Sequence, residues 1–170
     1  MIFLTVGTHY LGFERLIKKV DQISKNIDEE IIAQIGNTKY IPKNIKYFRF
    51  TNEEKLEDIY ENARVIISHA GAGTILTIFQ HKKIAIIVPR LKKYNEHIDN
   101  HQTELADVLK KEKKAIVVYN IEKLENAIKE TEKINFKNTE GKQKLVNFLK
   151  KYIERIENEN MHADINTFST

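Results

Sequence analysis

Residues 65–76 constrain the fold more than any other segment of this chain. Residues 65–68 form an apolar run that ends in Ser68, residues 70–73 are all alanine or glycine, and Thr74 opens a run that continues only as a helix. This order predicts a buried strand, a small-residue turn and the N-terminus of a helix. Two of the four turn residues are glycines, which are able to adopt positive φ, so the peptide N–H groups are able to crowd around a ligand.

The chemistry expected at this turn is anion binding. A helix N-terminus carries unpaired N–H donors and the positive end of the macrodipole, which together favour a phosphate or a pyrophosphate. The turn lacks the Gly-Lys-Ser/Thr ending of a nucleotide-triphosphate loop, and its glycines are too close together for the dinucleotide fingerprint. Glycine turns also join strands to helices for packing alone, and the pattern leaves that alternative open.

Strand and helix patterns alternate along the rest of the chain. Apolar runs predict strands at 2–6, 30–35, 46–50, 64–68, 84–88 and 115–119, and helical spacing begins at Phe13 after the first of them. This alternation predicts an α/β fold, a doubly wound parallel sheet of about six strands. The expected domain covers residues 1–130, followed by a C-terminal helical extension at 131–158 and a loose tail at 159–170.

A second turn, Gly7-Thr8-His9, follows the first predicted strand. Because the strands of a parallel sheet end at one edge, we expect Gly7 and Thr8 to lie beside the glycine turn and to face the same ligand. The alternative is that these two residues merely reverse the chain.

A dense polar segment follows the predicted strand that ends before Pro89. Ligands of open α/β sheets bind at this edge, so hydrogen bonding to a polyhydroxylated ligand is expected. The alternatives are a solvated start of the next helix, with Ile98 on that helix's apolar face, and a metal site at His97, His101 and Glu104. The candidate binding residues in this segment are Arg90, Asn95, Asn100, His101 and Gln102.

Composition narrows the classes of function. The chain has 170 residues and no cysteine, so disulfides and thiolate metal sites are excluded. Its net charge of +4 comes from lysines scattered among nearly as many carboxylates, which describes a solvated surface rather than a nucleic-acid groove. No basic leader precedes the first apolar run, and no run reaches the roughly 20 residues that cross a bilayer.

Together these motifs resemble the carboxyl-terminal half of a GT-B glycosyltransferase of family 28. Within that family the chain is most similar to the small stand-alone subunits of bacterial exopolysaccharide and capsule synthesis, the PssE-like proteins, and to their eukaryotic relative Alg13. The match runs from Met1 to about Leu109. Its motifs are Thr5-Val6-Gly7-Thr8, residues 13–17, residues 68–74, Val88-Pro89-Arg90, Tyr94-Asn95-Glu96-His97 and residues 100–106.

The resemblance implies a UDP-sugar donor whose diphosphate lies against the glycine turn. The site residues that it implies are Gly7, Thr8, His69, Ala70, Gly71, Ala72, Gly73, Thr74, Arg90 and Asn95, with Asn100, His101 and Gln102 facing the donor sugar. Many relatives carry a glutamate that holds the ribose hydroxyls where this chain has Thr77, so ribose recognition is expected to be weaker.

The resemblance also implies an inverting displacement without a metal or other cofactor, and the chain has no Asp-X-Asp motif. The catalytic base is expected from the missing half of the enzyme, although His9 and His69 are conceivable. The expected partner is a membrane-anchored subunit of the PssD or Alg14 type. It would bring this cytoplasmic chain to the inner face of the membrane and a lipid-linked saccharide acceptor.

Two alternatives to a catalytic subunit remain from the sequence. One is a non-catalytic nucleotide-sugar-binding regulatory or scaffold subunit, since fold alone does not determine function. The other is a phosphosugar-binding domain unrelated to transfer. Exposed apolar surface meant for a partner could also produce a homodimer of the isolated chain.

Overall fold

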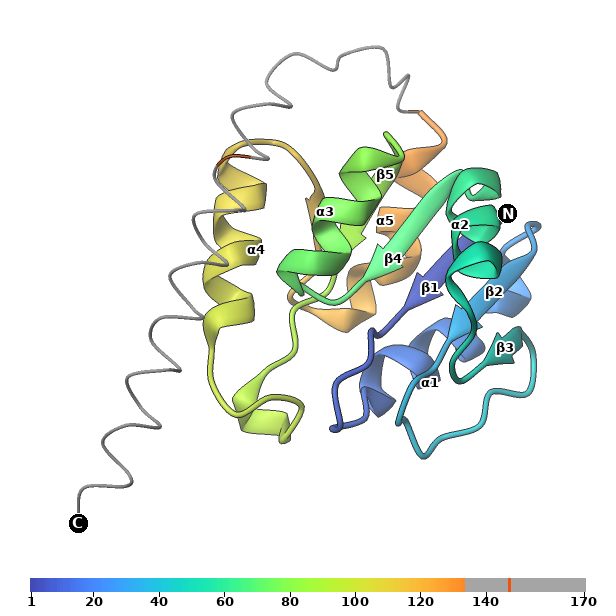
Figure 1. Cartoon of the computed structure of the whole chain (residues 1–170), viewed down its shortest axis with the longest axis horizontal. Helices are drawn as coiled ribbons and strands as arrows, with labels where there is room; N and C mark the ends of the chain where they lie inside the picture. Colours follow the sequence, from blue (N-terminus) through green and yellow to red (C-terminus); the bar gives the residue numbers. More distant parts are fainter. Residues whose placement is uncertain (134–146, 148–170) are drawn as a thin grey trace. The chain divides into compact units, whose positions relative to one another are not determined.

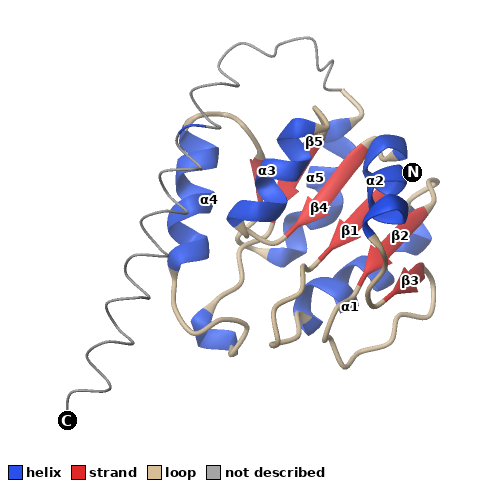
Figure 2. Cartoon of the chain, in the orientation of Figure 1, coloured by secondary structure: helices blue, strands red, loops and turns tan. Residues whose placement is uncertain are grey.

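The computed structural model describes residues 1–133 and residue 147, and this part of the chain contains one parallel sheet of six strands. The strands run in the order β3-β2-β1-β4-β5-β6, and every neighbouring pair is parallel. Figure 2 shows the sheet with helices around it. The strands are β1 (Ile2–Thr5), β2 (Ile31–Gln34), β3 (Lys46–Phe48), β4 (Val65–Ser68), β5 (Ile84–Ile87) and β6 (Ile116–Val117). The predicted doubly wound sheet is confirmed.

Helices lie in every connection between successive strands except the one from β2 to β3, and they cover both faces of the sheet (Figure 1). One face packs against α1 and α5, and on the other Phe3 of β1 meets Tyr60 of α2 with ring centroids 5.3 Å apart. Both faces are therefore buried, which explains the continuous apolar runs of the strands. The helices are α1 (Glu14–Ile23), α2 (Glu53–Asn62), α3 (Ala72–Gln80), α4 (His101–Lys111) and α5 (Leu124–Thr131), with short 3-10 turns η1 (Ser24–Asn26), η2 (Lys92–Tyr94) and η3 (Ile121–Lys123).

The start of α4 differs from the prediction. The helix begins at His101, and the residues before it form an irregular segment in which Asn95 has a φ of 55°. Ile98 lies in this segment with 59% of its surface exposed, so its predicted place on the apolar face of the helix is wrong. Leu105 and Leu109 do form that face and are fully buried.

The predicted helical extension at 131–158 and the tail at 159–170 lie outside the described residues, apart from residues 131–133 and 147. Across the described part, none of the helices combines the length and the apolar character that crossing a bilayer requires.

Candidate functional site

A cavity of about 890 Å³ opens where β1 and β4 end side by side. In the sheet, β2 lies beside β1 in one direction and β4 lies beside it in the other, so the strand order reverses at β1. The carboxyl ends of β1 and β4 are therefore the switch point at which doubly wound sheets bind ligands. The lining includes Thr5, Gly7, Thr8, His9, Gln34, Glu53, Leu56, Glu57, Tyr60, His69, Gly71, Ala72, Gly73, Thr74, Thr77, Gln80, His81, His97 and Gln102. The two predicted turns therefore share one cavity.

The amide groups at the start of α3 form the anion-binding part of this cavity. The first backbone hydrogen bond of the helix is donated by Ile75 to the carbonyl of Gly71, at 3.0 Å. The N–H groups of Ala72, Gly73 and Thr74 precede that bond and are the unpaired donors of the helix N-terminus. A Cβ built on Gly73 meets nothing within 4 Å, so the backbone here is open to a ligand.

The glycines of this site have different roles from those expected. Gly71 has a φ of −86°, and among the described glycines positive φ occurs at Gly7 and Gly36, so the glycines of the 70–73 turn do not use the positive φ that they are able to adopt. Gly71 is needed for space, because a Cβ there would lie 2.2 Å from Nε2 of His69. Gly7, with a φ of 70°, also approaches this ring closely, because a Cβ there would lie 2.6 Å from Cε1.

His69 is a buried neutral imidazole. Its exposed fraction is 7%, and burial, reinforced by the charge of Arg90, lowers its pKa from 6.5 to about 3. A ring that stays neutral at physiological pH supplies no positive charge to a phosphate. The anion affinity of this part of the cavity therefore rests on backbone dipoles rather than on His69.

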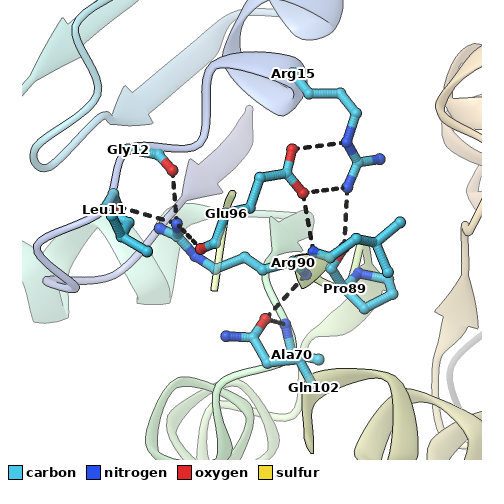
Figure 3. Close-up of polar contacts among 9 residues, drawn as sticks. Leu11, Gly12, Arg15, Ala70, Pro89, Arg90, Glu96 and Gln102 are labelled. Carbon is cyan, nitrogen blue, oxygen red and sulfur yellow. Dashed lines mark hydrogen bonds and ion pairs between the residues drawn. The ribbon is translucent and has the colours of Figure 1, made fainter. Parts of the chain in front are cut away.

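Gln102 ties the glycine turn to the end of β5. Its Oε1 accepts hydrogen bonds from the N–H groups of Ala70, at 3.2 Å, and of Arg90, at 3.1 Å (Figure 3). The amide of Ala70 is thus already paired within the protein, and Ala70 is absent from the lining of the cavity, which corrects its expected place in the donor site.

Arg90 lies outside the cavity lining and is fully buried. Its guanidinium donates to the carbonyls of Val6 and Glu96 and to those of two residues in the loop after β1, Leu11 and Gly12, at 2.8–3.1 Å. Arg90 therefore positions loops, and its expected contact with the donor is not what the geometry provides. Asn95, Asn100 and His101 also lie outside the lining.

A buried ion pair that the sequence reasoning missed holds the segment before α4. Both Glu96 oxygens accept from Arg15 of α1 at 2.8 Å, and Oε2 also accepts the N–H of Leu91 at 3.0 Å. Figure 3 shows this pair beside Arg90. A sequence signal was present, because Glu96 lies inside one of the motifs that carry the family resemblance.

Helix α2 provides a further wall of the cavity that was also missed. Leu56 and Tyr60 of this helix both line the cavity. Opposite them, His81 stacks on Tyr60 with centroids 5.2 Å apart and contacts Glu57 at 3.0 Å. The predicted Thr77 lines the cavity too, and its hydroxyl donates to the carbonyl of Gly73 at 3.2 Å.

The metal alternative finds no support in the described residues, where no three His, Asp or Glu side chains are grouped as ligands. His101 instead contacts Asp99 and Glu104 at 3.8 and 3.6 Å.

Comparison with known proteins gives the family. Residues 1–156 match the model of the glycosyltransferase family 28 C-terminal domain. The UDP-N-acetylglucosamine transferase subunit ALG13 of Mus musculus is 32% identical over 121 residues, which are 65% of this chain and 10% of the mouse protein. A UDP-N-acetylglucosamine--N-acetylmuramyl-(pentapeptide) pyrophosphoryl-undecaprenol N-acetylglucosamine transferase of Prochlorococcus marinus (strain MIT 9312) is 27% identical over 152 residues, covering 85% of this chain and 39% of that protein. The chain thus spans well under half of these relatives.

Solved structures give the fold. MurG of Acinetobacter baumannii superimposes with a TM-score of 0.55 and 22% identity, over 88% of this chain and 49% of that one. The calicheamicin glycosyltransferase CalG4 superimposes with a TM-score of 0.59 and 12% identity, over 91% of this chain and 43% of that one. The expected correspondence to one half of a GT-B glycosyltransferase is confirmed.

Proposed function

Because this chain belongs to the glycosyltransferase family 28 C-terminal domain family, we propose that it is the UDP-sugar-binding catalytic subunit of a two-component inverting glycosyltransferase. The proposed reaction transfers a hexose to a lipid-linked acceptor in the biosynthesis of a polysaccharide or glycan. The observation that carries the proposal is the set of unpaired amides at Ala72, Gly73 and Thr74, which open onto a cavity at the switch point of the sheet.

The proposed chemistry uses these amides for the leaving group. An acceptor hydroxyl attacks C1 of the donor sugar, the bond from C1 to the β-phosphate oxygen breaks, and the configuration at C1 inverts. UDP departs with an additional negative charge, which the amides and the dipole of α3 stabilise without rearranging. The mechanism is proposed to be independent of a metal ion.

The need for a partner is supported by a relative, because the mouse protein similar to this chain is itself named a subunit. A second subunit is therefore proposed to supply the other wall of the site. A membrane-anchored partner of the PssD or Alg14 type would keep this chain at the inner face of the membrane, next to a lipid-linked acceptor. The PssE-like branch, with a role in exopolysaccharide or capsule synthesis, stays a prediction.

Substitution of Gly73 tests the proposed diphosphate site. We expect UDP to bind the wild-type chain saturably in calorimetry, and Gly73→Asp to abolish that binding because a carboxylate would face the diphosphate. The fold should survive, since Gly73 has open space around it and an acidic residue in the first turn of a helix is favourable by about 0.3–1 kcal/mol. Gly73→Ala is the matched control and should retain most of the affinity.

The absence of saturable UDP binding by the wild-type chain would contradict the proposal, as would unchanged binding by Gly73→Asp. UDP binding without transfer, even with membranes of the source organism that supply partner and acceptor, would favour the regulatory or scaffold subunit.

A further inference from the structure

A small loop, residues 91–96, lies between β5 and α4, and its two ends are joined. The carboxylate of Glu96 accepts the N–H of Leu91 at 3.0 Å, and the N–H of Glu96 donates to the carbonyl of Leu91 at 3.4 Å. Between these ends η2 turns the chain tightly, and Asn95 adopts a left-handed φ of 55°. The loop is therefore closed at its base by contacts of its own.

Buried contacts hold this base in place. Glu96 is 4% exposed, and its two carboxylate oxygens accept from Arg15 of α1 at 2.8 Å (Figure 3). The fully buried Arg90 donates to the carbonyl of Glu96 at 3.1 Å. Because the base is buried and paired, the exposure of the tip of the loop is a built feature of the fold.

The tip carries two cations and an aromatic ring. Lys92, Lys93, Tyr94 and Asn95 are all exposed, and Tyr94 exposes 53% of its surface. The ammonium of Lys93 lies 4.9 Å from the centroid of the Tyr94 ring. Neither lysine forms an ion pair with another residue of the described part of the chain. Their two positive charges are therefore available to an external anion.

Two more exposed apolar side chains lie next to this loop. Ile98 follows it in the chain, and Tyr10 lies in the loop after β1 and is 67% exposed. Tyr10 stacks on His9 with ring centroids 4.6 Å apart, and His9 stacks on His97, the neighbour of Ile98, at 4.9 Å. The loops after β1 and β5 thus share one surface, which we call the edge patch. Its members are Tyr10, Lys92, Lys93, Tyr94 and Ile98.

The charge of the edge patch stays positive when the carboxylates of the same segment are counted. Glu96 is neutralised by its ion pair with Arg15. Asp99 contacts His97 at 2.9 Å and His101 at 3.8 Å, and it carries one negative charge against the two lysines. The patch therefore combines excess positive charge with exposed apolar surface.

This combination fits the surface of an anionic bilayer. Tyrosine favours the headgroup level, where its ring is covered and its hydroxyl stays hydrated, and isoleucine gains free energy by leaving water. Lysines are attracted by the negative surface potential of anionic lipids. A protein partner fits less well, because lysines are depleted from the cores of protein–protein interfaces.

We propose that the edge patch binds directly to the surface of an anionic phospholipid bilayer. Its three apolar side chains enter the headgroup layer, and its two lysines contact lipid phosphates. The inference goes beyond the proposed function, in which a partner provides the membrane attachment, and it does not depend on sugar transfer. Because His9 and His97 line the cavity next to the patch, the contact also brings the cavity close to the membrane surface.

A single fluorescent reporter tests the contact directly. The chain has no tryptophan, so Tyr94→Trp places one at the tip of the loop. We expect its emission to shift to the blue with vesicles made of equal parts of phosphatidylcholine and phosphatidylglycerol, and to stay unchanged with phosphatidylcholine alone. The matched control is Tyr47→Trp, at an exposed tyrosine of the edge strand β3, and its emission should not shift.

Substitution of the lysines tests the charge. In sedimentation with the same anionic vesicles, we expect Lys92→Gln with Lys93→Gln to weaken binding of the whole chain by about tenfold or more. Lys110→Gln with Lys111→Gln is the matched control, because it removes the same charge from an exposed pair at the other end of α4. Lys110 also lies beside a tyrosine ring, at 5.3 Å. This control should weaken binding less than about threefold.

Three outcomes would overturn the inference. The first is an emission from Tyr94→Trp that anionic vesicles leave unshifted, and the second is an equal loss of vesicle binding in both lysine double variants. The third is a Lys92→Gln, Lys93→Gln chain that keeps vesicle binding but loses attachment to membranes of the source organism, which would make the patch a contact for a protein. The Kd for UDP should change less than about threefold in all these variants, so a wild-type chain that fails to bind UDP would count only against the proposed function.

Discussion

At the scale of single residues, the glycines of this site make room for a histidine. His69 lies against both Gly7 and Gly71, and a methyl group on either would come within 2.6 Å of its ring. The ring is therefore closely confined, and Ser68 is near its Nδ1 at 3.4 Å. Burial without a carboxylate partner is what keeps its pKa near 3.

The depressed pKa of His69 predicts a pH-dependent stability. In the unfolded chain His69 binds a proton near pH 6.5, whereas in the folded protein it does so only near pH 3, so the unfolded state gains protons first as the pH falls. The contribution of His69 is fully present above about pH 6.5 and is lost progressively toward pH 3. Urea unfolding between pH 7.5 and 4 should show a loss that approaches about 1.4 kcal/mol per pH unit from this residue.

His69→Asn isolates this contribution, because the other titrating groups are shared by both proteins. The free energy of unfolding of the variant should fall less steeply with decreasing pH than that of the wild type. Parallel curves for the two proteins would show that His69 is not buried in the neutral form.

At the scale of elements, three loops at the carboxyl edge of the sheet are joined by side chains rather than by strands. Arg90 at the end of β5 reaches the carbonyls of the loop after β1, and Gln102 of α4 reaches the amide of Ala70 in the turn after β4. The ion pair of Glu96 with Arg15 adds a link between α1 and the segment before α4. These contacts hold both loops that form the anion site in place.

Arg90→Lys tests whether this residue positions loops or binds the donor. An ammonium lacks the planar fork that serves four carbonyls, so we expect a loss of about 2–3 kcal/mol in the free energy of unfolding. The Kd for UDP, measured at a temperature where the variant is folded, should change less than about threefold. The control is Arg64→Lys at the partly exposed pair with Glu29, which should cost less than about 1 kcal/mol. Unchanged stability with lost UDP binding would make Arg90 a donor-binding residue.

At the scale of the whole molecule, the topology of the sheet determines where the cavity lies. β1 and β4 are neighbours in the sheet, but the chain goes on from β1 to β2 and from β4 to β5, which lie in opposite directions along the sheet. The loops after β1 and β4 therefore separate and leave a space, and residues of α2 and α3 extend its lining. The strands beside the cavity are fully buried, whereas its loops are partly exposed. A rigid sheet thus presents two less protected turns to the ligand.

Hydrogen–deuterium exchange should reveal this arrangement in the whole chain. The amides of β1, β4 and β5 should exchange most slowly, because they lie in buried parallel ladders. Saturating UDP should slow exchange at residues 7–9 and 71–74 and leave the amino edge, around residues 27–30, unaffected. Protection confined to the amino edge would place the ligand site elsewhere.

Much of the fold was predictable because its signals are local. Apolar runs identified the six strands of the described part within a few residues, helical spacing from Phe13 identified α1, and the small residues before Thr74 identified the start of α3. The coincidence of the Gly7 and Gly71 turns also followed from a general rule, since parallel strands of one sheet end at the same edge.

Three features depended on contacts between distant segments and were decided only by the tertiary structure. Arg90 turned inward because four unpaired carbonyls from three segments converge on it, α2 became a wall of the cavity through packing of Tyr60 on Phe3, and His9 met His97 across 88 positions of sequence. The sequence by itself therefore determined the elements and the anion-binding backbone, whose physics lies within a few neighbouring residues. The directions of the side chains around that backbone depend on which loops meet, and only the folded chain sets those.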